Sequence, residues 1–166
     1  QKQWHLETEV EELYIDLSID FVNTKATRHD VQQKARQYFA QVKPIMAEHD
    51  SYQIHLCGRL IEVSQFTSVN DYASTIDVCE RAIAFFSAKN YEANIPLQIF
   101  HYQKLICHLQ LQQIEEAFAE AKASEAFLEE GTFNWFKLQE VRLQLYLFTK
   151  KYAAAAELVA RILEHD

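Results

Sequence analysis

Seven histidines and three cysteines are the residues of this 166-residue chain best suited to metal binding or nucleophilic catalysis. His101 and His108 are seven residues apart. On a helix they would lie about 10 Å apart along the axis, too far to share one ion without ligands from elsewhere. Cys107 is adjacent to His108, so on a helix the two side chains would point about 100° apart rather than form a nucleophile and base. The spacing predicts no catalytic residue, no metal site and no cofactor.

Carboxylates are the second group that could perform chemistry, because a pair of them can act as general acid and base. Six glutamates fall close together in one predicted helix and the residues that follow it. Their spacing places them opposite Ile114, Ala117, Phe118 and Ala121, which predicts a solvated helix face rather than an active site. These glutamates are Glu115, Glu116, Glu120, Glu125, Glu129 and Glu130.

Glycine and proline are scarce, with two of each in the chain. Sandwiches, barrels and hairpin-rich folds use both residues in their turns, so an all-β fold is excluded. Two glycines also cannot build a glycine-rich phosphate loop or a Gly-x-Ser-x-Gly nucleophile elbow. The composition therefore favours a non-catalytic, all-helical protein.

The formal net charge is −8. Nucleic-acid binding depends on clustered Lys and Arg, and anionic membrane surfaces repel an acidic protein, so both partners are disfavoured. The three cysteines fit no zinc or redox motif, which favours free thiols in the cytoplasm. The chain starts without an initiator Met and ends directly after a helical pattern, which predicts a fragment of a longer protein.

Apolar residues recur at three- and four-residue spacing from end to end, the pattern of amphipathic helices. Short polar segments divide the pattern into about eight helices, and short connections favour antiparallel packing of neighbours. No linker interrupts residues 1–166, so we expect a single domain. The predicted helices are 4–23, 28–43, 51–66, 71–89, 95–110, 112–129, 133–149 and 152–165.

Individual residues mark the expected helix ends. Thr27 followed by Asp30 resembles a capping box, and Pro96 suits the first turn of a helix. Gly131 is expected at the C′ position that ends the acidic helix. Pro44 either ends the second helix or kinks a longer one that continues to Glu48. Gly58 falls inside a predicted helix, where two backbones could approach closely.

The repeat pattern is clearest in residues 145–163, where Tyr146 is followed by a Lys150-Lys151 turn, Tyr152 and Ala155. This stretch resembles a tetratricopeptide repeat. Equivalent positions recur earlier in the chain, and the anchor residues are 41, 42 and 38 residues apart, a longer period than the family's 34. The first unit has Lys34 and Gln41 where the family has small residues. The anchors are Val31, Tyr72, Ile114 and Tyr152.

The resemblance implies four helical hairpins in a right-handed α–α superhelix; a compact helical bundle is the alternative. In that family the first helices of successive hairpins line a groove that holds a peptide or a helix of another protein. The expected function is therefore a non-catalytic scaffold that binds a protein or peptide. The groove positions implied for this chain are Asn23, Arg59, Ser64, Tyr102, Lys137, Glu140 and Gln144.

Two other functions stay open at this point. The chain could be a regulatory or dimerisation domain of a larger signalling or transcription protein. An all-helical enzyme would need a polar pocket that brings His101 or His108 close to Glu or Cys from another helix. A homo-oligomer is compatible with the sequence.

Overall fold

Helices account for all the regular structure in the part of the chain described here. The computed structural model describes residues 2–23, 26–89, 91 and 94–165. Within these ranges it has eight helices and no strand, so the all-helical prediction is confirmed. The helices are α1 (Lys2–Val22), α2 (Arg28–Glu48), α3 (Tyr52–Thr67), α4 (Tyr72–Ala88), α5 (Ile95–Gln110), α6 (Ile114–Glu125), α7 (Phe133–Phe148) and α8 (Tyr152–Leu163).

Several helices begin at the residues that the sequence predicts. At the start of α2, the Thr27 hydroxyl accepts a hydrogen bond from the Asp30 backbone N–H at 3.1 Å, and the Asp30 carboxylate accepts one from the Thr27 N–H at 3.1 Å. This reciprocal pair is the expected capping box. Pro96 lies in the first turn of α5, as predicted.

Two predicted features of helix ends are resolved or corrected by the structure. Pro44 lies inside α2, which continues to Glu48, so the shorter version of this helix is wrong. The predicted helix 112–129 ends earlier, because α6 stops at Glu125. The following N–H groups bond to carbonyls three residues back, which tightens the chain into turns. Gly131, with φ of +82°, therefore does not end α6 but directly precedes Thr132, the N-cap of α7.

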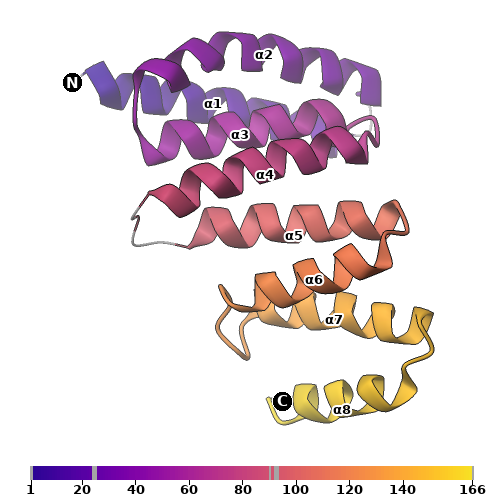
Figure 1. Ribbon diagram of the computed structural model, residues 1–166. Coiled ribbons are helices and arrows are strands. Elements are labelled where there is room, and N and C mark those ends of the chain that lie inside the picture. Colours follow the sequence, from indigo (N-terminus) through magenta and orange to yellow (C-terminus); the bar gives the residue numbers. More distant parts are fainter. Residues whose placement is uncertain (1, 24–25, 90, 92–93, 166) are drawn as a thin grey trace. The chain divides into compact units, whose positions relative to one another are not determined.

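The chain divides into two compact units, unit 1 (residues 1–82) and unit 2 (residues 83–166), with the division inside α4. Figure 1 shows that consecutive helices within each unit run in opposite directions. In unit 1, each of the helices α1, α2 and α3 packs against the other two. Their buried apolar residues follow helical spacing and form one cluster: Val10, Leu17, Val31, Ala35, Val42, Met46, Ile54, Cys57 and Ile61.

Gly58 allows close packing inside unit 1. A Cβ atom built on Gly58 would lie 2.4 Å from Met46 Sδ and 3.1 Å from Val42 Cγ1, both from α2. Real Cβ atoms essentially never approach another atom as closely as 2.4 Å, so any larger residue at this position would require the Met46 thioether to move. The close approach expected at Gly58 is thus present, although the atoms that meet it belong to α2 side chains.

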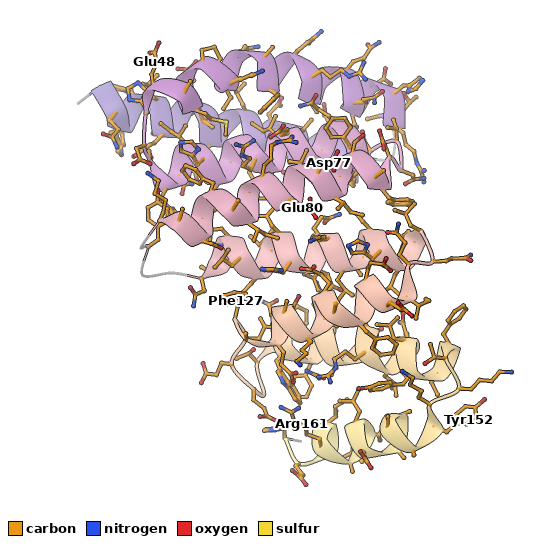
Figure 2. All side chains as sticks on the ribbon, in the orientation of Figure 1. Glu48, Asp77, Glu80, Phe127, Tyr152 and Arg161 are labelled. Carbon is orange, nitrogen blue, oxygen red and sulfur yellow. The ribbon has the colours of Figure 1, made fainter. Side chains whose placement is uncertain are left out.

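In unit 2, α5 packs on α6, α6 on α7, and α7 on α8. Small residues occupy the seam, since Ala117 and Ala121 of α6 are buried against Leu105 of α5 and Leu138 of α7. Charged contacts attach α8: Arg161 binds Glu125 at 3.1 Å and Glu130 at 2.6 Å. Figure 2 shows Arg161 near the end of α8, beside the turns that follow α6.

Candidate functional site

A cavity of about 290 Å³ in unit 2 contains two of the residues predicted to bind a partner. Helix α5 contributes Gln98 and Tyr102, which are four residues apart and so share a face. Helix α7 contributes Asn134 and Lys137, three residues apart, and its start is set by the Thr132 hydroxyl, which accepts from the Trp135 N–H. The remaining lining residues are Ile99, Gln103, Ser124 and Leu128.

Lys137 and Tyr102 meet across this cavity. The Lys137 ammonium lies 4.8 Å from the centroid of the Tyr102 ring and 5.7 Å from that of Phe133. Both distances are within the range of cation–π attraction. Burial, and then the negative charge of Glu140, raise the pKa of Tyr102, so its hydroxyl stays protonated at neutral pH and can donate a hydrogen bond.

Two amide side chains connect α5 to α7 at the same cavity. Gln98 donates from Nε2 to the Phe127 carbonyl at 2.9 Å, which sets the orientation of its side chain. Its Oε1 accepts from Asn134 Nδ2 at 3.3 Å. Asn134 keeps a second N–H and its own carbonyl oxygen for other partners. The cavity therefore offers amide donors and acceptors, a phenol and a cation next to apolar surface.

The other predicted site residues lie elsewhere. Glu140 and Gln144 continue along α7 and are exposed, but they do not line this cavity. In unit 1, Asn23 is exposed just after α1. Ser64 donates its hydroxyl to the Leu60 carbonyl at 2.9 Å, within its own helix. Arg59 binds Glu62 in a different cavity. Tyr102 and Lys137 are thus the two members of the predicted set that the structure brings into contact.

A buried charged cluster joins α5 to α6. Glu120 contacts His101 Nδ1 through Oε1 and Lys104 Nζ at 3.2 Å through Oε2, and its side chain is only 9% exposed. The prediction that Glu120 lies on a solvated face is therefore wrong, because His101 and Lys104 of the neighbouring helix hold it inside. Burial acts to raise the pKa of Glu120, but His101 and Lys104 outweigh it and the pKa is lowered.

This cluster contains the His–Glu pairing that the enzyme hypothesis required. Neither His101 nor Glu120 lines the cavity beside Tyr102. The His101 ring also stacks on Phe127, with the ring centroids 5.2 Å apart. Each group thus has partners that fix it between α5 and the end of α6, which is the geometry of a structural ion cluster.

Gln98 and Asn134 were not among the predicted site residues, although the sequence carries a signal for both. Gln98 is four residues before Tyr102, and Asn134 is three before Lys137, so each shares a helix face with a residue that was selected. The polar face could have been found from spacing alone. The hydrogen bond between the two amides could not, because it depends on how α5 and α7 pack.

The described residues contain no group of three or more His, Cys, Asp or Glu side chains arranged to hold a metal ion. The cysteines are buried and form no disulfide, and burial raises the pKa of the Cys57 thiol to about 11. None of the helices in the described ranges is both long and apolar enough to cross a membrane.

Comparison of the chain with protein-family models, with curated proteins and with solved structures finds no match.

Proposed function

We propose that this chain is a non-catalytic helical-repeat module that binds an extended peptide segment of a protein in the cavity between α5 and α7. The observation that carries the proposal is the contact of Lys137 with Tyr102, 4.8 Å from ammonium to ring centroid, beside the amides of Gln98 and Asn134. These are the kinds of groups that recognise a peptide: amides pair with backbone N–H and C=O groups, and tyrosine covers apolar side chains.

The tetratricopeptide-like arrangement is part of the same proposal. It is supported by the eight helices of the described ranges and by the small residues at the hairpin seams, where Ala117, Ala121 and Ala155 are buried. Small residues at such positions let paired helices approach closely, as in stacked helical repeats. Three free, buried cysteines support a reducing location such as the cytoplasm.

Peptide display tests the proposal with a defined ligand. Peptides selected on the folded protein are measured by calorimetry against the wild type and against Tyr102→Ala and Lys137→Gln. We expect each variant to weaken binding about tenfold, because each removes a contact of roughly 1.4 kcal/mol. Lys122→Gln on the exposed surface of α6 has the same charge change and is the matched control.

The helical circular dichroism and the thermal midpoint of each variant are measured alongside, so that loss of fold is separated from loss of binding. Selected peptides that bind Tyr102→Ala and Lys137→Gln as tightly as the wild type would remove this cavity from the proposal. A Lys122→Gln variant that weakens binding equally would point to general charge attraction instead.

A further inference from the structure

A second cavity, of about 480 Å³, lies within unit 1 between α2, α3 and α4. It is lined by Lys43 from α2, by His55, Arg59 and Glu62 from α3, and by Arg81 from α4. The chain as a whole carries a formal charge of −8, yet this cavity has three permanent cations and one carboxylate. Its local excess of positive charge is therefore opposite in sign to that of the protein.

Glu62 orients two of the cations. One carboxylate oxygen contacts Arg59 Nη1 at 2.5 Å, and the other contacts Arg81 Nη2 at 2.7 Å. The Glu62 side chain is 9% exposed, so the two guanidinium groups are held by a buried anchor. One negative charge is shared by two arginines, and Lys43 adds a third positive charge, which leaves the group with a net charge of about +2.

The cations retain unused hydrogen-bonding capacity. Arg59 Nε is buried and has no hydrogen-bond partner among the described residues. Arg81 uses Nη2 on Glu62, while its side chain stays 52% exposed. Lys43 is exposed and makes no ion pair with the residues described. A guanidinium has five N–H donors, so both arginines can bind a second acceptor while they hold Glu62.

The nearby acidic residues other than Glu62 lie outside the lining of this cavity. Asp77 and Glu80, both labelled in Figure 2, lie on α4 together with Arg81, but neither lines the cavity. Glu48, at the end of α2, is also outside the lining. His55 bonds through Nε2 to the His49 carbonyl at 3.0 Å. On the wall from α2, Phe39 and Met46 supply apolar surface.

We propose that this cavity binds a small organic phosphate monoester, with the dianionic phosphate held by Arg59, Arg81 and Lys43 and the organic part resting on Phe39 and Met46. A net charge of about +2 matches the phosphate dianion, and arginine pairs suit phosphate geometry. The volume exceeds that of a bare phosphate and falls in the range of small-molecule sites. The inference concerns unit 1 and is independent of the peptide cavity in unit 2.

Phenyl phosphate is the probe, titrated into the whole chain by calorimetry at pH 7.5 and low ionic strength. We expect saturable binding that weakens about tenfold in Lys43→Gln and in Arg81→Gln, since each loses a charge-assisted hydrogen bond. Arg36→Gln is the matched control, because it removes the same charge from an exposed position on α2 outside the cavity, and it is expected to leave binding unchanged.

Two further probes test the contributions of the phosphate charge and of the ring separately. Phenyl sulfate, a monoanion of the same shape, and inorganic phosphate, which lacks the ring, are each expected to bind at least about fivefold more weakly than phenyl phosphate. Absence of phenyl phosphate binding by the folded wild type overturns the proposal. It is also overturned if inorganic phosphate binds equally well, or if Arg36→Gln weakens binding as much as Lys43→Gln does.

Discussion

In unit 1 three helices share one core, whereas in unit 2 each helix packs on the next along the chain. The cluster of unit 1 takes residues such as Val10, Val42 and Ile61 from α1, α2 and α3. The cluster of unit 2 runs from Leu105 of α5 through Ala121 of α6 to Leu138 of α7. Mutual packing makes each helix depend on two others, while serial packing lets an end helix separate with fewer losses.

The two packing modes also use small residues differently. Unit 1 relies on a glycine, Gly58, whose missing Cβ leaves room for Met46 of α2. Unit 2 uses the buried alanines Ala117 and Ala121 at its seam. In both units a small residue lets two helices pack closely. Single substitutions at these residues can therefore measure how tightly the helices of each unit pack.

The largest expected effect comes from removing a buried branched side chain in each unit. Ile54→Ala in unit 1 and Leu138→Ala in unit 2 both act on fully buried residues. Each is expected to lower the free energy of unfolding by about 3 kcal/mol through lost burial and a residual cavity. Urea unfolding gives the size of the loss, and hydrogen exchange gives its distribution along the chain.

The distribution of the hydrogen-exchange changes along the chain distinguishes the two units. Ile54→Ala should speed exchange in α1, α2 and α3 together, because all three contribute to that core. Leu138→Ala should speed it most in α7 and in its neighbours α6 and α8. Equal exchange changes along all of the described helices in both variants would contradict the contrast between shared and serial packing.

An intermediate effect is expected from adding one methyl group at Gly58. Alanine improves helix propensity by up to about 1 kcal/mol, but its Cβ meets Met46 Sδ and forces that side chain to move, at a cost of about 1–3 kcal/mol. Gly58→Ala should therefore destabilise the protein by about 1 kcal/mol. Thermal and urea unfolding measure this change.

Met46→Ala serves as the partner in a double-mutant cycle. With the thioether gone, the extra methyl of Gly58→Ala should fill vacated space, so the double variant should be more stable than the sum of the two single effects predicts. Strict additivity would mean that the close approach at Gly58 does not limit the packing of α2 on α3.

The smallest expected effect is a pH-dependent loosening of α8. Hydrogen bonds from Arg161, and then from His165, lower the pKa of Glu130 to about 2. A carboxylate whose pKa is lowered by folding stabilises the fold above its unfolded pKa of about 4.5. That contribution falls as the pH drops from about 4.5 towards 2. Arg161 and His165 both contact the Trp135 ring, so Trp135 fluorescence can report the change.

The fluorescence is measured between pH 2 and 5 in a Trp4→Phe background, which removes the exposed second tryptophan. Glu130→Gln should reduce the pH-dependent change in this range. Asp16→Asn in unit 1 is the comparison: the pKa of Asp16 is lowered by Lys34 and Tyr38, far from Trp135 in the chain. A fluorescence transition unaltered by Glu130→Gln would show that another group controls the contact of α8.

Local signals explain why most of the helices could be predicted. Thr27 and Asp30 cap each other, and Pro96 starts α5, through interactions that reach no more than three residues along the chain. The end predicted for α6 was wrong because Gly131 has the residue type of a C′ position. The chain already turns at Ala126 and Phe127, and the Phe127 ring stacks on His101 of α5. That packing is not visible in local sequence.

The residues of the candidate site show the same distinction between what local sequence predicts and what depends on packing between helices. The resemblance to tetratricopeptide repeats implied Tyr102 and Lys137 as groove residues, and these two residues do meet. The ion pairs of Glu62 and Glu120 each include a residue 19 positions away in a neighbouring helix, Arg81 for Glu62 and His101 for Glu120. Polar residues of this kind could be assigned to a face of their own helix but not to a partner on another one.

The reaction rates of the three buried thiols can report how often each unit opens. Cys57 and Cys79 belong to unit 1 and Cys107 to unit 2, and all three are buried. A thiol reagent can reach them only after the surrounding helices separate, and the raised pKa of Cys57 slows its reaction further. The alkylation rate of each cysteine, followed by mass spectrometry, therefore measures how often the helices around that cysteine separate.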